Sequence, residues 1–260
     1  MKIALGLEYD GSCFSGWQTQ PSGAGVQDAV ERALSGIAGT PVTVTGAGRT
    51  DAGVHALGQV AHFEVDVVRS DSAWVRGGNA ALPLGVAVLW AQPVSDEFHA
   101  RYRAIERCYR YLLLNRPVRS ALHAGRVGWF HAPLELAPMR EAAALLLGRH
   151  DFSAFRSAEC QARTAVRELR GIEVERRGDL VVFELRADAF LHRMVRNIVG
   201  CLVYVGKGKY PPAWLGEVLA SRDRARAAPT FAPDGLYLAE VRYDEKWQLP
   251  RNSRGTPEFW

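Results

Sequence analysis

The chain has 260 residues, enough for one large domain or two small ones, and its 48% of hydrophobic residues argues against a disordered protein. A net charge of +4 is only mildly basic and by itself selects no class of partner. No apolar run reaches the roughly 18 residues of a membrane helix, and the first residues lack the apolar core of a signal peptide. Four cysteines without metal-ligand spacing indicate reduced thiols in a cytoplasmic protein: Cys13, Cys108, Cys160 and Cys201.

The first hundred residues predict strands mixed with helices. Strand signals, either period-two alternation or a β-branched run, occur at residues 3–9, 42–45, 61–67 and 86–90. Helical spacing occurs at residues 26–37 and 72–82, which stop at Gly39 and before Pro83. The alternation at residues 3–9 is typical of a half-buried strand.

The rest of the chain repeats this mixture. Strand signals occur at residues 108–114, 164–174, 180–186 and 236–243, and helical spacing at 136–147 and 190–205. Arg177, Gly178 and Asp179 form a turn that predicts a hairpin of the strands at 164–174 and 180–186. The pattern is not a regular βαβ alternation, so we expect an α+β fold with a mostly antiparallel sheet. We expect two halves, 1–103 and 104–245, and a polar tail at 246–260.

Basic residues gather in two segments. Between residues 101 and 126 there are seven arginines and one acid, and between 186 and 209 five basic residues and one acid. The guanidinium fork matches phosphate oxygens, so such clusters suit a nucleic acid, although a solvated surface has the same composition. GKGK at 206–209 lacks the phosphate-loop pattern and is also explained by a helix C-terminal turn.

The glycine-rich stretch GAGRTDAGVHA, at 46–56, is the first candidate for chemistry. Its glycines permit unusual dihedrals and close approach to a ligand, and Arg49 and Asp51 stand between them. The segment is also compatible with a surface turn that carries an ion pair. A metal-dependent hydrolase using Asp51, His55 and His62 is a further alternative, but no second acid and histidine cluster completes a site.

Two later segments offer further candidates. In the strand at 108–114, Tyr109 and Tyr111 point to one face, where a tyrosine could stack on a base or pack across strands. In FLHRMVRNIVG, at 190–200, Arg196 lies beside the apolar stripe of the expected helix. A buried arginine needs an anionic partner, and Asp51 is the natural candidate.

Taken together in this order, the segments resemble one family. GAGRTDAGVHA, RCYRY, HDFSAFR, FLHRMVRNIVG and APDGLYL resemble the TruA-type tRNA pseudouridine synthases, and the resemblance runs from residue 9 to residue 238. It implies the pseudouridine synthase fold, an antiparallel sheet flanked by helices with two similar halves and a central cleft. It also implies a homodimer that binds tRNA and needs no cofactor and no metal.

The resemblance implies roles for five residues. Asp51 would be the catalytic aspartate, acting as nucleophile or as charge stabiliser, and Arg49 would help to hold the target nucleotide out of its stack. Tyr109 would pack on the uracil, Arg196 would pair with the aspartate, and Leu236 would line the pocket. The expected reaction is isomerisation of uridine to pseudouridine at positions 38, 39 and 40 of the anticodon stem-loop. A non-catalytic RNA-binding protein and a synthase with a different RNA target remain the alternatives.

Overall fold

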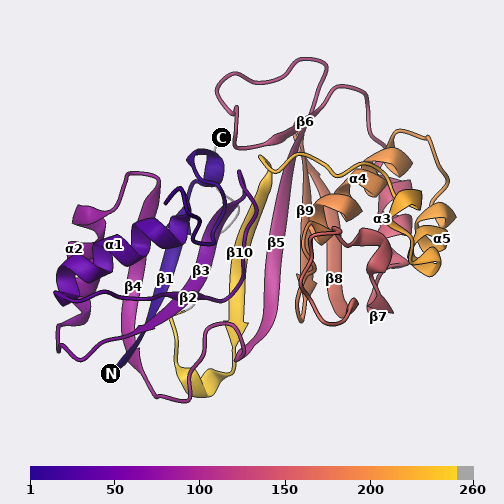
Figure 1. The fold of residues 1–260 in the computed structure, drawn as a ribbon. Helices are drawn as coiled ribbons and strands as arrows, with labels where there is room; N and C mark the ends of the chain where they lie inside the picture. Colours follow the sequence, from indigo (N-terminus) through magenta and orange to yellow (C-terminus); the bar gives the residue numbers. More distant parts are fainter. Residues whose placement is uncertain (251–260) are drawn as a thin grey trace. The chain divides into compact units, whose positions relative to one another are not determined.

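A computed structural model describes residues 1–250, which form two compact units (Figure 1). Among the described residues, unit 1 contains Met1–Ile105 and residues 237–250, and unit 2 contains Glu106–Leu236. The last strand is therefore grouped with the N-terminal half, whereas the sequence led us to expect it in the second half. Most of the expected tail, residues 251–260, lies outside the described residues.

The strands of unit 1 follow the order β4-β1-β3-β10. Their bounds are Lys2–Tyr9 for β1, Thr45–Gly46 for β2, His55–Glu64 for β3, Val86–Val94 for β4 and Leu236–Tyr243 for β10. β1 pairs antiparallel with both β3 and β4, and β2 pairs antiparallel with β3. β10 pairs parallel with the start of β3, with Tyr237 opposite His55. This pairing holds the beginning of β3, where the glycine-rich stretch ends, between two strands.

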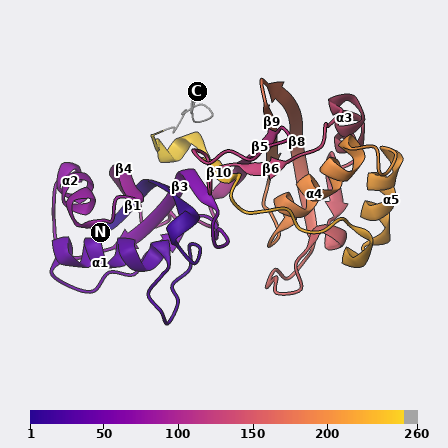
Figure 2. The same cartoon turned by 90° about the horizontal axis from the view of Figure 1, so that it is seen from above.

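Two helices, α1 (Val26–Ala38) and α2 (Asp71–Ala81), pack with the strands of unit 1 and with each other (Figures 1 and 2). Their bounds lie close to the predicted helices. Gly39 ends α1 in the left-handed region at φ 74°, which glycine adopts without strain. Trp74 of α2 is fully buried and meets Phe63 of β3 edge-on at 5.1 Å between ring centroids.

Two expectations for unit 1 were wrong. β1 is buried on both faces, not one. On the face that carries Gly6, the side chain of Trp90 from β4 packs directly against the glycine. The strand expected at residues 42–45 is reduced to β2. The backbone N–H groups of Val42 and Val44 instead donate to the side chains of Ser35 and Glu31 on α1, at 2.9 and 2.8 Å. Side-chain acceptors on a helix thus replace the sheet ladder there.

The strands of unit 2 follow the order β5-β9-β8-β7. Their bounds are Ala104–Asn115 for β5, Gly128–Phe130 for β6, Gly148–Asp151 for β7, Val166–Arg177 for β8 and Leu180–Ala187 for β9. The neighbours in this order pair antiparallel, and β6 pairs parallel with the end of β5. β8 and β9 form the predicted hairpin, with Gly178 at φ 57° in its turn.

Three helices belong to unit 2: α3 (Leu136–Ala144), α4 (Met194–Gly206) and α5 (Ala213–Ser221), of which α5 was not predicted. The helix expected from residue 190 begins only at Met194, because Arg193 adopts the left-handed region at φ 62°. Antiparallel pairs dominate in both units and helices flank the strands, so the α+β prediction is confirmed. Among residues 1–250, no helix is long and apolar enough to cross a membrane.

Candidate active site

The glycine-rich stretch forms the loop between β2 and β3 in unit 1. Asp51 is half-buried in this loop, whereas Arg49, two residues earlier, is exposed. An extended backbone would have turned both side chains to one side, and the loop gives them different surroundings. The backbone N–H of Val54 donates to the carbonyl oxygen of Asp51 at 3.1 Å, which closes a tight turn that begins at Asp51.

Thr50, directly before Asp51, forms hydrogen bonds through both its side chain and its backbone. Its hydroxyl lies 2.9 Å from that of Tyr9 on β1, and its carbonyl oxygen accepts the N–H of Trp17 at 3.0 Å. Gln59 of β3 donates through Nε2 to the carbonyl oxygen of Gly48 at 2.8 Å and to the Tyr9 hydroxyl at 3.4 Å. Burial raises the pKa of Tyr9 to about 12, so its hydroxyl stays protonated and can donate to Thr50. Hydrogen bonds between uncharged, mostly buried groups therefore hold the loop in place.

Close backbone approach restrains the other side of the loop. Gly16 has φ 95°, and a β-carbon at this position would lie 2.6 Å from the carbonyl oxygen of Thr50. Gly53, within the loop, has φ 77°. Only glycine satisfies both conditions without strain, so the segment before α1 packs directly on the backbone around Asp51.

The two histidines of the hydrolase alternative have separate surroundings. His55 Nδ1 accepts the N–H of Gly11 at 3.0 Å, and the ring stacks on Tyr237 of β10 at 4.6 Å. His62 Nδ1 accepts the N–H of Ala100 at 3.2 Å and its ring faces His99 at 4.7 Å. In the described part of the chain, no group of three or more histidine, cysteine, aspartate and glutamate residues could hold a metal ion. Both histidines are thus parts of the hydrogen-bonded core of unit 1.

Tyr109 lies in the middle of β5 in unit 2, opposite Leu185 of β9. Its side chain is mostly buried, with 8% of its surface exposed, and it meets Phe190 edge-on at 5.1 Å. Tyr111, two residues later, is fully buried and donates to the carbonyl oxygen of Ala232 at 2.9 Å. The two tyrosines differ accordingly: Tyr111 is fully buried, and Tyr109 retains a small exposed fraction.

Arg196 lies in the first turn of α4 and is half-buried, as its position beside the apolar stripe predicts. Its Nε donates to the carbonyl oxygen of Phe231 at 2.8 Å, and the N–H of Phe231 donates back to the carbonyl oxygen of Arg196 at 3.3 Å. This pair of bonds fixes the base of the guanidinium against the segment that precedes β10.

Asn197, which the sequence did not single out, anchors the same segment. It is completely buried, and its Nδ2 donates to the carbonyl oxygen of Phe155 at 2.8 Å. Its Oδ1 accepts from Thr230 Oγ1 at 2.6 Å and from Arg224 Nη2 at 3.1 Å. A polar residue on the buried side of an otherwise apolar helix was the available signal, because such a group needs partners.

Leu236 begins β10 and is buried, and its N–H donates to the carbonyl oxygen of Pro233 at 2.8 Å. Gly235 precedes it, and a β-carbon there would collide with the carbonyl oxygen of Leu112 on β5. Unit 2 therefore carries Tyr109, Arg196 and Leu236, and unit 1 carries Asp51 and Arg49. The pairing of Asp51 with Arg196 joins residues of different units and stays a prediction.

Known proteins match this chain in sequence over most of its length. A family model described as tRNA pseudouridine synthase matches residues 7–103 and 142–244. A protein of Thiobacillus denitrificans named tRNA pseudouridine synthase A is 61% identical over 257 residues, 99% of both chains. One of Paraburkholderia phymatum with the same name is 58% identical and covers 98% of this chain and 96% of its own. A solved Cbf5-Nop10-Gar1 complex is 13% identical with a TM-score of 0.37, over 91% of this chain and 48% of that one.

Proposed function

The chain belongs to the tRNA pseudouridine synthase family, and we propose that it isomerises uridines 38, 39 and 40 in the anticodon stem-loop of tRNAs. As a member it is an isomerase that converts uridine to pseudouridine in tRNA. The observation that carries the residue assignment is the loop of unit 1, where buried hydrogen bonds on both sides of Asp51 present one half-buried carboxylate.

The reaction is a rearrangement within one nucleotide, in which a carboxylate can take part. The bond between ribose C1′ and uracil N1 breaks, the base turns, and C1′ bonds to C5, while a proton leaves C5 and one is gained at N1. No atom is added, so no cosubstrate is consumed. In this proposal Asp51 acts as nucleophile or stabilises the charge that develops when the glycosidic bond breaks.

Arg196 would keep that carboxylate ionised. A nearby guanidinium favours the charged form of a carboxylate, which burial opposes. The bond from Arg196 Nε to the carbonyl oxygen of Phe231 supports this role, because it fixes the orientation of the guanidinium.

Tyr109 and Arg49 would handle the target nucleotide. The uridine must leave its stack at a cost of a few kcal/mol, and an aromatic face can recover part of that cost. The remaining exposure of Tyr109 supports a contact with the base, and the exposed position of Arg49 supports a contact with the RNA backbone. Leu236 would contribute apolar lining to the base pocket.

The proposal includes a homodimer in the cytoplasm, with tRNA as its partner. The basic clusters at residues 101–126 and 186–209 support binding to the RNA backbone. A non-catalytic RNA-binding protein accounts for these clusters but has no use for a carboxylate presented on a rigid loop, because a carboxylate repels phosphate. A synthase with a different RNA target is the second alternative.

The test is to incubate the protein with an unmodified tRNA transcript, without metal or nucleotide, and to map pseudouridine by carbodiimide adducts and primer extension. Asp51→Asn removes the charge and keeps the shape, and Asp71→Asn at the exposed start of α2 is the matched control. We expect stops at positions 38–40 for the wild type and the control and none for Asp51→Asn. Stops elsewhere would indicate another target, and binding without any stop would indicate a non-catalytic protein.

A further inference from the structure

Two lysines with no acidic partner stand at the end of α4 in unit 2. Lys207 and Lys209 are both exposed, and neither forms a salt bridge with a carboxylate among residues 1–250. Lys207 Nζ lies 4.2 Å from the ring centroid of Tyr204, and Lys209 Nζ lies 4.5 Å from the centroid of the same ring. One aromatic ring thus brings two like charges together, within a distance at which salt screens them only in part.

The rings around these lysines form a stacked platform. Lys209 also lies 5.2 Å from the ring of Tyr210, which in turn stacks on Trp214 of α5 at 4.2 Å and 20°. Attraction to the helix dipole explains a lysine near this end of α4. It does not explain why a second lysine shares the ring or why half-buried aromatic rings line the same surface. We call Tyr204, Lys207, Lys209 and Tyr210 the lysine–tyrosine cluster.

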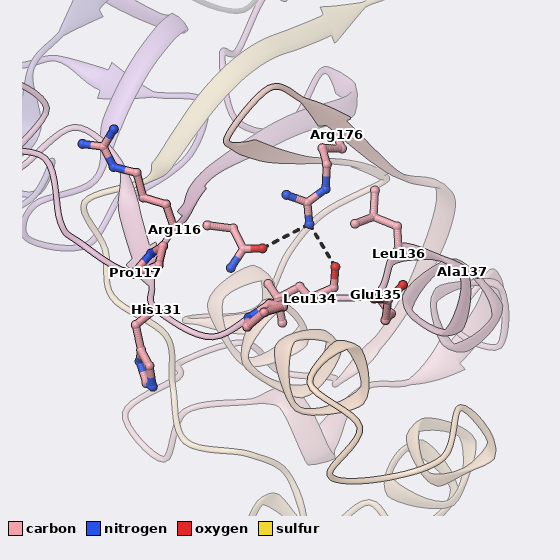
Figure 3. A pocket seen from close by; sticks show the side chains of 10 residues that line it. Arg116, Pro117, His131, Leu134, Glu135, Leu136, Ala137 and Arg176 are labelled. Carbon is pink, nitrogen blue, oxygen red and sulfur yellow. Dashed lines mark hydrogen bonds between the residues drawn. The ribbon is translucent and has the colours of Figure 1, made fainter.

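Figure 3 shows a hollow of unit 2 that is lined by two arginines, of which Arg116 also forms an ion pair with Asp179 at 3.7 Å. It has a volume of about 590 Å³, and Arg116, His131 and Arg176 are among its lining residues. Arg176 Nη2 donates to Asn115 Oδ1 at 3.1 Å and to the carbonyl oxygen of Leu134 at 2.9 Å, so this guanidinium is held in place. The hollow adjoins a second one, lined by Lys207 and Tyr210, and Pro133 and Glu135 border both. Glu135 is the acidic residue in the shared rim.

The lysine–tyrosine cluster and the hollow lie far enough from the proposed active-site residues of unit 2 that one ligand must span several nucleotides to reach both. Lys207 follows Arg196 by eleven residues along α4, or about 16 Å at roughly 1.5 Å per residue. Asn115, at the edge of the hollow, follows Tyr109 by six residues along β5, or about 20 Å at roughly 3.3 Å per residue. Consecutive phosphates of one strand lie a few ångströms apart, so a ligand that reaches from the proposed site to this surface spans several nucleotides.

We propose that the lysine–tyrosine cluster, with Arg116 and Arg176 of the adjoining hollow, binds the sugar–phosphate backbone of the substrate RNA several nucleotides from the reacting uridine. This rests on the proposed function for the identity of the RNA. Phosphate oxygens bound to both lysines relieve their mutual repulsion, and the tyrosine faces accept an unstacked base or a ribose.

The experiment measures the affinity of the full-length protein for a tRNA transcript by filter binding between about 50 and 200 mM salt. Lys207→Gln with Lys209→Gln removes two contacts, so the slope of log affinity against log salt should fall by about two. The affinity lost through the substitutions should then be about tenfold larger at the lowest salt than at the highest. Lys207→Arg with Lys209→Arg should restore the wild-type slope.

The matched control removes two exposed charges from unit 1, Arg69→Gln with Arg76→Gln, and its slope should stay near that of the wild type. An unchanged slope in the double lysine variant, or an equal fall in the control, overturns the proposal. Pseudouridine formation by the wild type on the same transcript is scored separately. A wild type that shows the lysine-dependent slope but forms no pseudouridine disproves the proposed function and leaves the RNA-binding surface standing.

Discussion

The hydroxyl groups of Tyr9 and Thr50 lie 2.9 Å apart in the core of unit 1, one residue before the candidate catalytic carboxylate. Tyr9 is 4% exposed and Thr50 is 7% exposed, so water does not replace this bond when it is lost. The position of Asp51 therefore depends on a buried contact between β1 and the loop.

Thr50→Val tests this contact with almost no change in shape. The Tyr9 hydroxyl would lose its acceptor inside the core, although Gln59 still donates to it, which should lower the free energy of unfolding by about 1–3 kcal/mol. Urea unfolding of Thr50→Val, Tyr9→Phe and the double variant gives the coupling between the two groups, expected at about 0.5–3 kcal/mol. Strictly additive effects would show that the hydroxyls do not depend on each other.

Gly16→Ala adds a single methyl group but should disturb the loop that carries Asp51. The new methyl group would meet the carbonyl oxygen of Thr50 at 2.6 Å in addition to the strain of a positive φ. Gly39→Ala is the matched control, because its φ is also positive but no atom lies within 4 Å. We expect Gly39→Ala to cost about 1–2 kcal/mol and to keep the rate of pseudouridine formation. Gly16→Ala should cost more and lose rate, and equal behaviour of the two would contradict the close approach.

Arg196→Ala should change how the reaction depends on pH. If the guanidinium stabilises the ionised form of Asp51, its removal makes the carboxylate easier to protonate, so the acidic limb of the rate profile moves to higher pH. The loss of activity should then be larger at pH 5.5 than at pH 8, in single-turnover measurements with saturating tRNA. Parallel profiles for the wild type and the variant would argue against the Asp51–Arg196 pair.

His62 should make unit 1 less stable in acid. Burial, and then the charges of His99 and Lys2, lower the pKa of His62 to about 4, and its Nδ1 accepts the N–H of Ala100, which requires the neutral ring. The unfolded pKa is about 6.5, so this contribution is complete above that pH and is lost as the pH falls toward 4, at most about 3 kcal/mol. Urea unfolding between pH 7 and 4 should show a smaller loss for His62→Gln. An identical loss would contradict the prediction.

Local patterns in the sequence were sufficient for most elements. The spacing of apolar residues predicted α1, α2 and the β8–β9 hairpin, and β10 has the predicted bounds, because each depends on a periodicity that the chain itself displays. The glycine-rich stretch and the half-buried Arg196 were also recognisable as candidates from residue type and spacing. The family followed from five motifs in one order, and the comparisons confirm it.

Tertiary contacts decided the rest. Residues 42–45 have the composition of a strand, but Ser35 and Glu31 on α1 take the N–H groups of Val42 and Val44, and no local pattern reveals such a distant partner. The left-handed conformation of Arg193 delays the start of α4, and the spacing of apolar residues does not reveal it. The support of the Asp51 loop by Tyr9, forty-one residues away from Thr50, exists only once β1 lies beside β3. The sequence identified the candidate reactive groups, and long-range packing determined which of them have a fixed position.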